Sequence, residues 1–300
     1  MPELPDITVY VESLTAKISG DTLERVRVLN PFLLRTAVPP IAAVEGARVV
    51  GVQRLGKRVV LALETAELGV CYLVIHLMIA GRLHWKPAGA KASSKGALAH
   101  FEFGGGTLVL TEAGTQRRAS LHLVQGAQAL ASLDPGGIEV ADCSPEAFAR
   151  QLRAENHTLK RVLTDPRRFS GIGNAYGDEI LHRARLSPLK LSQSLSDAQA
   201  QQLLDATRTV LQEWTQRLRG QAAAHGGWPD KVTAFRPEMA VHGRFGQPCP
   251  DCGTPVQRIV HADNETNYCA RCQTEGRLLA DRALSRLLKA SWPKRVDEGL

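Results

Sequence analysis

Four cysteines near the C-terminal end constrain this chain more than any other feature of its sequence. They form two pairs, Cys249 with Cys252 and Cys269 with Cys272, in a C-x2-C-x16-C-x2-C pattern. Each pair places two thiolates on one tight turn, and two such turns close a tetrahedron around a Zn²⁺ ion. Residues 254–268 have the pattern strand, turn, strand, so we predict a zinc ribbon with one structural ion. A redox role is disfavoured because there are two pairs, and four cysteine ligands leave no open position for catalysis.

The other two cysteines, Cys71 and Cys143, are expected to be inert thiols. The first residues lack the basic start and apolar run of a secretory signal. The most apolar stretch, 68–79, is shorter than the ~20 residues that a membrane helix requires. We therefore expect a cytoplasmic protein in a reducing compartment, without a membrane partner.

The pattern along the chain changes near residue 140. Before that point, a helix is predicted over 5–18 from the helical spacing of Ile7, Val11, Leu14 and Ile18. Short β-branched runs follow it, and many such runs without intervening helices favour an antiparallel sandwich or barrel. These predicted strands cover 23–29, 47–55, 57–64, 71–79, 100–103 and 107–112.

From Ser144 onward the pattern is helical. Ser144 is a predicted N-cap, and Ser196 with Gln199 forms a predicted capping box. The predicted helices cover 144–155, 157–165, 174–184, 196–218 and a basic stretch at 278–292. The fold class is therefore α+β, and the predicted domains are 1–140, 144–240, a finger at 241–276 and an extension at 277–300.

The chain is basic, with 37 Lys and Arg against 30 Asp and Glu, a net charge of +7. The positive excess lies in 51–100 and 151–250. Such a balance favours a polyanionic partner, although a basic enzyme without a nucleic-acid role has the same composition.

Two local features carry possible chemistry. Gly171 and Gly173 precede Asn174, a predicted N-cap, and the exposed amides of a helix start can hold a phosphate. A tight interhelical turn would need the same glycines. At the other end, removal of Met1 would give Pro2 a secondary amine beside Glu3. An amine can form a Schiff base with a sugar aldehyde carbon, and a carboxylate can move protons. An ordinary N-terminus with a proline is the simpler interpretation.

Taken together, the chain resembles the formamidopyrimidine-DNA glycosylase and endonuclease VIII family over nearly its whole length. The segments that carry the resemblance are MPELPD at the start, RLGKRVVL around Lys57, IHLMIAGRL at 75–83, residues 159–188 with GIGN, and the cysteine finger. The resemblance implies a β-sandwich, a helix–two-turn–helix domain with a zinc finger, and duplex DNA in the cleft between them. It also implies that a damaged nucleotide is flipped out of the duplex.

The resemblance implies roles for individual residues. Pro2 would attack C1′ and displace the base, Glu3 would move the protons, and Lys57 would contact the phosphate beside the lesion. The resulting imine permits β-elimination, and possibly δ-elimination, so strand cleavage accompanies base release. The predicted DNA contacts are Lys57, Met78, Ile79, Arg117, Arg118, Lys160, Gly171, Gly173, Asn174 and Asn264.

The sequence departs from the family pattern in four places. Asp6 replaces a glutamate. Asn264 stands five residues before the third cysteine, where the family has an arginine, and this puts δ-elimination in doubt. Three further changes lie among the residues that, in the family, fill the space left by the flipped nucleotide. Met78 replaces a glycine, Ile79 replaces the intercalating methionine, and Ala119 replaces a phenylalanine, while Arg117 can stand for the arginine wedge. The extension at 277–300 has no counterpart in shorter members, and a solvated helix is its simplest interpretation.

We therefore expect a bifunctional DNA glycosylase and abasic-site lyase that binds damaged double-stranded DNA as a monomer in the bacterial nucleoid. A lyase or glycosylase for unusual lesions, such as bulky adducts or crosslinks, is one alternative. A DNA-binding protein without catalysis is the other, and the intact Pro2 and Glu3 disfavour it.

Overall fold

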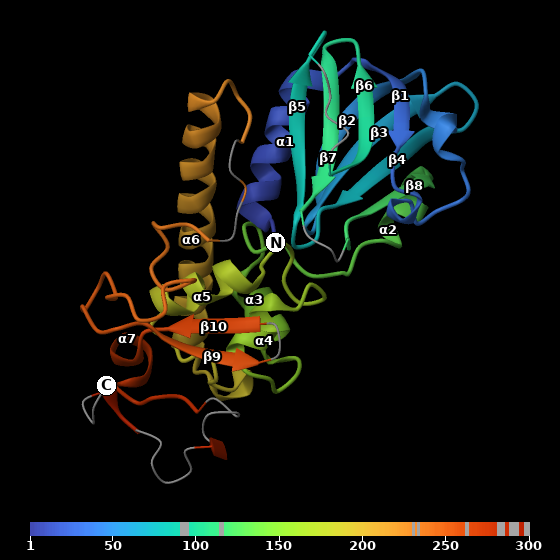
Figure 1. Cartoon of the computed structure of the whole chain (residues 1–300). Coiled ribbons are helices and arrows are strands. Elements are labelled where there is room, and N and C mark those ends of the chain that lie inside the picture. The colour runs from blue at the N-terminus through green and yellow to red at the C-terminus, as the bar shows by residue number, and fades with distance from the viewer. Residues whose placement is uncertain are drawn as a thin grey trace. The chain divides into compact units, whose positions relative to one another are not determined.

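The computed structural model describes residues 1–90, 96–113, 117–229, 232, 235–261, 264–280, 286–287 and 294–296 (Figure 1). The chain divides into two compact units. Unit 1 comprises Met1–Pro135 with Trp214–Thr233, and unit 2 comprises Gly136–Glu213 with Ala234–Leu300. The long helix α6 (Asp197–Ala224) therefore contributes to both units, and the four-part division by sequence stays a prediction.

Unit 1 is built on one antiparallel ladder of eight strands in the order β5-β7-β6-β1-β2-β3-β4-β8. The ladder bends at β1, which pairs with β6 along its length but with β2 only at Thr22 and Leu23. A register shift between Leu23 and Arg25 accompanies the bend, and such bulges sharpen strand curvature. The sheet thus folds into two layers, and the predicted β-sandwich is confirmed (Figure 1). The strands are β1 (Thr22–Val28), β2 (Ala47–Leu55), β3 (Arg58–Thr65), β4 (Gly69–His76), β5 (Gly81–Pro87), β6 (Ala97–Phe103), β7 (Gly106–Glu112) and β8 (Ser120–Gln125).

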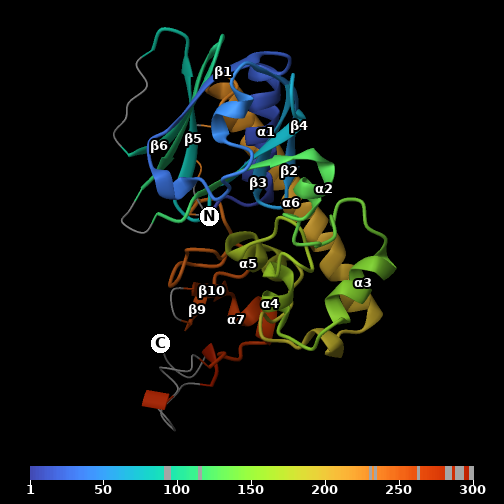
Figure 2. The same ribbon diagram turned by 90° about the vertical axis from the view of Figure 1, so that its right-hand side faces the viewer.

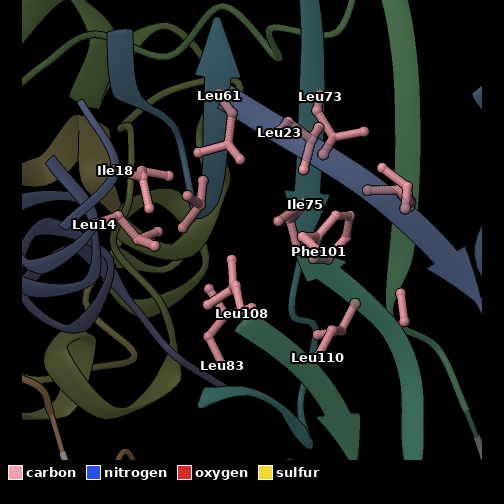
Figure 3. Packing of buried hydrophobic residues seen from close by; sticks show 14 of the residues in the cluster. Leu14, Ile18, Leu23, Leu61, Leu73, Ile75, Leu83, Phe101, Leu108 and Leu110 are labelled. Carbon is pink, nitrogen blue, oxygen red and sulfur yellow. The ribbon is translucent and has the colours of Figure 1, made fainter. Parts of the chain in front are cut away.

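Apolar side chains fill the space between the two layers. Helix α1 (Leu4–Ile18) contributes Ile7, Leu14 and Ile18, each fully buried, as the helical spacing predicts. Figure 3 shows Leu14 and Ile18 beside side chains from the strands, among them Leu61. Burying one such side chain contributes about 1.5–3 kcal/mol. Short helices, η1 (Pro31–Leu33), η2 (Ile41–Val44) and α2 (Gly126–Ala131), connect or end the strands.

The last turns of α6 pack on α1 within unit 1. Leu218 and Ala222 form a small buried cluster with Val9. The guanidinium of Arg219 donates to both carboxylate oxygens of Glu12, at 2.6 and 2.9 Å. A bidentate ion pair adds geometric definition to this apolar contact.

Unit 2 combines helices with a two-stranded hairpin (Figure 2). Its remaining elements are α3 (Pro145–Arg153), α4 (Leu159–Thr164), α5 (Asn174–Arg183), η3 (Ser192–Ser194), β9 (Gln257–His261), β10 (Asn264–Tyr268) and α7 (Ala270–Thr274). The predicted N-cap is confirmed, since the Ser144 hydroxyl accepts from the Ala147 N–H at 3.2 Å. The capping box of Ser196 and Gln199 is also confirmed, with both reciprocal bonds present.

The predicted strand over 71–79 is too long, because β4 ends at His76 and a turn follows. The structure adds β5 and β8, which the sequence pattern did not predict. The predicted basic helix at 278–292 lies largely outside the described residues, and residues 277–280 are not helical. Within the described part of the chain, no helix has the length and apolar character needed to cross a membrane.

Candidate functional site

Two of the three predicted catalytic residues, Pro2 and Glu3, directly precede α1, and the third is Lys57. Glu3 is the N-cap and Asp6 is the third residue of the helix. The Glu3 N–H donates to Asp6 Oδ2 at 2.9 Å, and the Glu3 carboxylate accepts from the Asp6 N–H. Both side chains are almost fully buried, as is Pro2. The shorter Asp6 therefore still closes a capping box, and this box orients Glu3.

The N-terminal amine lies in a setting that favours its neutral form. Burial lowers the pKa of the Met1 amine, and the positive charges of Arg82 and Lys57 lower it further. The carboxylates of Glu3 and Asp6 act in the opposite direction. The net direction for the Met1 amine is downward, because burial outweighs the two carboxylates.

Lys57 lies in the turn between β2 and β3, where Gly56 adopts φ +59°. On the neighbouring strand, His76 pairs in register with Arg58. Burial, followed by the charges of Arg58 and Lys57, lowers the pKa of His76 to about 4. His76 is therefore a neutral imidazole beside the predicted phosphate-binding lysine.

Arg82 and His76 were not predicted as site residues, although both belong to the IHLMIAGRL segment. Polar residues that flank a turn in an otherwise apolar strand are the signal that would have found them.

The turn after β4 carries the predicted void-filling residues. Met78 adopts φ +51°, in the left-handed region, and Ile79 is 58% exposed. A Cβ on Gly81 would lie 2.2 Å from the Leu77 carbonyl oxygen, so this turn requires glycine at that position. The turn thus presents Ile79 to solvent on a tightly specified backbone.

The segment before β8 carries two exposed arginines that are predicted DNA contacts. Arg117 and Arg118 precede β8, and the Arg118 N–H donates to Glu112 Oε1 at 2.9 Å. Ala119, which replaces the family's phenylalanine, is 3% exposed and belongs to the core of unit 1. The buried Glu112 carboxylate also accepts from the Ala119 N–H, which holds the backbone of this segment.

The glycine loop of unit 2 leads directly into α5. Gly171 adopts φ +78°. The predicted N-cap at Asn174 is wrong by one position, because Gly173 is the N-cap and Asn174 is the first residue of the helix. The Asn174 side chain is used elsewhere, as its Nδ2 donates to the Glu265 carbonyl of β10 at 2.9 Å. Figure 2 shows α5 near the hairpin that makes this contact.

Lys160 lies directly behind this loop. Its side chain is nearly buried, and its ammonium donates to the Asn174 carbonyl and to Asp178 Oδ1, the latter at 2.5 Å. The other oxygen of Asp178 accepts from His242 Nδ1–H at 2.7 Å. The structure gives the ammonium these protein partners, and a direct contact of Lys160 with DNA stays a prediction.

A second buried carboxylate fixes the segment before the finger. Glu179 accepts from the backbone N–H groups of Ala240, Val241 and His242, at 2.7 to 2.9 Å. Three donors satisfy a buried carboxylate well, because each bond to a charged acceptor is stronger than a neutral one. This contact joins α5 to the chain that enters the finger.

The finger hairpin carries Asn264 at its exposed end. The described arginine nearest to Asn264 in sequence is Arg258, and its guanidinium already has partners within the protein. The Arg258 guanidinium lies 3.2 Å from Glu265 Oε2 and stacks over the Phe245 ring, 4.3 Å from the centroid. The position where the family has an arginine therefore carries an uncharged amide.

The four cysteines lie together in unit 2. Their sulfur atoms are all within 4.8 Å of one another, with Cys249–Cys272 at 3.9 Å and Cys252–Cys269 at 3.4 Å. Four sulfurs at about 2.3 Å from one Zn²⁺ are spaced by about 3.8 Å, so these thiols fit the ion. The other cysteines, Cys71 and Cys143, have raised pKa values because of burial, in keeping with inert thiols.

His182 of α5 contacts one of the zinc ligands. Its Nε2 lies 3.3 Å from Cys249 Sγ. Burial lowers the pKa of His182, so its neutral imidazole can donate one N–H to the thiolate. Such a bond orients a metal ligand, and here it connects the finger to the helix that carries Asn174.

These features define a class of protein: one with an N-terminal β-sandwich, a helical second unit and a zinc finger of four cysteines. The family model for the formamidopyrimidine-DNA glycosylase N-terminal domain matches residues 1–172. The H2TH domain model of the same family matches residues 135–222, and a zinc finger found in FPG and IleRS matches residues 246–274. The chain belongs to the formamidopyrimidine-DNA glycosylase family.

Individual relatives support the same assignment. The chain is similar to the formamidopyrimidine-DNA glycosylase of Thermus thermophilus, with 34% identity over 92% of this chain and 100% of the relative. The crystal structure of MutM (Fpg) from Thermus thermophilus superposes with a TM-score of 0.75 over 91% of this chain and 98% of that one, at 33% identity. A formamidopyrimidine-DNA glycosylase-like protein of Mycobacterium tuberculosis is 42% identical over 51% of this chain and 94% of the relative. The Lactococcus lactis Fpg in complex with Fapy-dG containing DNA has the same fold, with a TM-score of 0.77 at 24% identity.

Proposed function

We propose that this chain excises damaged bases from duplex DNA and then cleaves the strand at the abasic site. The observation that carries the proposal is the start of α1, where the buried Pro2 directly precedes Glu3, whose carboxylate is oriented by the capping box with Asp6. A binding protein without catalysis has no need for a buried, oriented carboxylate directly beside Pro2. The Lactococcus lactis relative makes Fapy-dG a suitable first lesion to test.

The chemistry follows from these groups. After removal of Met1, the Pro2 nitrogen attacks C1′, and the bond from C1′ to the base breaks as the base leaves with the electron pair. The leaving base takes up a proton from water, and the N–H proton that Pro2 loses passes to the Glu3 carboxylate. Glu3 then donates this proton to O4′ as the C1′–O4′ bond breaks, and an iminium links Pro2 to C1′. The Glu3 carboxylate next takes a proton from C2′, and the C3′–O bond breaks as the 3′ phosphate leaves with the electron pair. Water then adds to C1′ and releases the Pro2 nitrogen.

DNA binding in this proposal relies on separate groups in each unit. Lys57 contacts a backbone phosphate from unit 1, and Asn174 with the Gly171–Gly173 loop contacts a phosphate from unit 2. The exposed Arg117 acts as the arginine wedge at the space left by the extruded nucleotide. Ile79 enters the space left by the extruded nucleotide. The protein acts as a monomer in the bacterial nucleoid.

The end of the finger hairpin at Asn264 determines whether δ-elimination follows β-elimination. Asn264 supplies no charge to a phosphate, and the guanidinium of Arg258 is held by Glu265 and Phe245. We therefore expect the reaction to end largely at β-elimination. Replacing Asn264 by Arg should increase the share of δ-elimination product.

The test uses duplexes with an abasic site, Fapy-dG, 8-oxoguanine or dihydrouracil, with borohydride added to trap the iminium. We expect a covalent adduct with the wild-type protein and none with Pro2→Gly. Lys17→Ala is a control, because Lys17 lies near the other end of α1 and should leave trapping unchanged. No adduct on any duplex would overturn the proposal and leave a binding role.

Glu3→Gln separates proton transfer from folding. A glutamine still offers an oxygen to the Asp6 N–H, so the start of α1 is retained, but it cannot donate a proton as an acid. We expect base release to fall by about 10²- to 10⁴-fold with DNA affinity unchanged. Base release at the wild-type rate would contradict the role of Glu3.

A further inference from the structure

A buried histidine of α5 lies beside the four cysteines of the finger. His182 is 4% exposed, and the two residues before it, Ile180 and Leu181, are fully buried apolar side chains. An imidazole in such a place needs a polar partner, because a buried N–H without one destabilises the fold. The partner that the structure gives Nε2 is Cys249 Sγ, at 3.3 Å. A polar group at this position of α5 is therefore explained by the zinc site.

The direction of this hydrogen bond follows from the chemistry of the metal ligands. Cys249 belongs to the cluster of four cysteines, and a cysteine binds Zn²⁺ as a thiolate, which has no proton to donate. The imidazole of His182 must therefore be the donor. Four thiolates carry twice the charge of one Zn²⁺, so an N–H donor to one of them stabilises an anionic site. Cys249 is 2% exposed, so water cannot readily supply this bond in place of the histidine.

The contact belongs to a row of polar side chains along one face of α5. Asn174, Asp178 and His182 are spaced by four residues, so they lie one above another on the helix. Asn174 Nδ2 donates to the Glu265 carbonyl at 2.9 Å. Asp178 accepts from His242 Nδ1–H at 2.7 Å. The row thus begins at the predicted phosphate site and ends at the zinc site, with contacts to the finger segment along its length.

The finger is also attached to the end of α5 by a second contact. Gln273 Nε2 donates to the Leu186 carbonyl at 2.9 Å, and Gln273 Oε1 accepts from the Cys269 N–H at 2.8 Å. These bonds do not involve His182. Substitution of His182 should therefore leave the finger in place while it removes the donor to the Cys249 sulfur.

We propose that His182 is a positioning residue for the zinc site, which orients the Cys249 thiolate and raises the affinity of the finger for Zn²⁺. Hydrogen-bond partners of metal ligands typically contribute about 10- to 100-fold to metal affinity. DNA binding then depends on His182 through the ion and not through a contact between His182 and DNA. This last step rests on the proposed function, whereas the effect on zinc affinity does not.

The test compares His182→Phe with His182→Gln in the full-length protein. Phenylalanine fills the buried space without a hydrogen-bonding group, whereas glutamine keeps an N–H donor at a similar distance from the backbone. Arg183→Gln is the control, because Arg183 is the next residue of α5 and pairs with Glu213 on the surface at 2.8 Å. Zinc affinity is measured by competition with a chelator of known affinity, and Co²⁺ is substituted for zinc to record the absorption spectrum.

We expect His182→Phe to bind zinc about 10- to 100-fold more weakly than the wild type. His182→Gln should lie closer to the wild type, and Arg183→Gln should equal it. With Co²⁺, a sulfur without its N–H donor transfers charge to the metal more easily. The sulfur-to-cobalt charge-transfer band of His182→Phe should therefore move to longer wavelength, while the d–d bands of a tetrahedral site remain. An unchanged zinc affinity or an unmoved charge-transfer band in His182→Phe would overturn the proposal.

DNA affinity tests whether His182 acts through the ion. With zinc in excess, His182→Phe and the wild type should bind a duplex with an abasic-site analogue equally well. As the chelator lowers free zinc, His182→Phe should lose DNA binding at a free zinc concentration about 10- to 100-fold higher than the wild type does. Weaker DNA binding by His182→Phe in excess zinc would contradict a role through the ion. If the zinc-loaded wild type itself fails to bind the duplex, the proposed function fails, and the zinc and cobalt measurements still decide the role of His182.

Discussion

The two units use ionisable groups in different ways. Around the N-terminal amine, charges alter proton affinities: the amine and His76 both have lowered pKa values, with Lys57 among the causes for each. Behind Asn174, charges instead form a buried set of partners, in which Asp178 accepts from both Lys160 and His242. In the first arrangement the charges change the proton affinities of groups around the predicted catalytic residues. In the second, the charges hold Asn174 in position.

This difference predicts where a substitution should change activity and where it should change stability. Removing a charge near the amine should alter reactivity with little effect on folding. Removing a charge behind Asn174 should weaken the fold, because the partner remains buried without compensation.

The largest expected effect comes from Asp178→Ala. Lys160 would keep the Asn174 carbonyl but lose its carboxylate, so we expect a loss of about 3–5 kcal/mol in the free energy of unfolding. Urea unfolding measures it. Glu213→Ala is the matched control, since Glu213 pairs with Arg183 at 2.8 Å on the surface and should cost less than about 1 kcal/mol. Equal losses of unfolding free energy in the two variants would show that the buried Asp178 interactions contribute no more to stability than a surface ion pair.

A smaller effect is expected for His76, as a change in the pH dependence of stability. Its pKa is about 4 in the folded protein and 6.5 when unperturbed, so the unfolded chain binds the proton first as pH falls. Stability is therefore full above the unfolded pKa and decreases as pH drops below it, by about 2 kcal/mol between pH 8 and pH 5.

The variant His76→Gln should remove this part of the acid sensitivity. Urea unfolding of both proteins across that pH range measures the difference, and the exposed His225→Gln is the control. If His76→Gln and the wild type have parallel pH profiles, the imidazole is not kept neutral by its surroundings.

Much of this arrangement could be predicted from the sequence, because local patterns specify it. The cysteine spacing predicted the cluster of thiols, and the helical spacing of Ile7, Leu14 and Ile18 predicted the buried face of α1. β8 was missed, since it reads SLHLVQ and its polar positions resemble a loop until pairing with β4 is known. The partner of Asn174 could not be predicted either, because Glu265 is distant in sequence and offers a backbone carbonyl that any residue would supply.

The smallest effect concerns Met78, where backbone strain and binding oppose each other. A non-glycine residue at φ +51° costs about 1–2 kcal/mol, and glycine adopts this conformation without that penalty. We therefore expect Met78→Gly to raise the melting temperature by about 2–4 °C, while the loss of an apolar side chain weakens binding to a duplex with an abasic site. Gly81→Ala in the same turn should lower the melting temperature, because its Cβ would meet the Leu77 carbonyl. A lower melting temperature for Met78→Gly would mean that packing of the half-buried Met78 side chain contributes more to stability than the backbone strain costs. Met78 would then be a residue that stabilises the turn, and its role in DNA binding would lose this support.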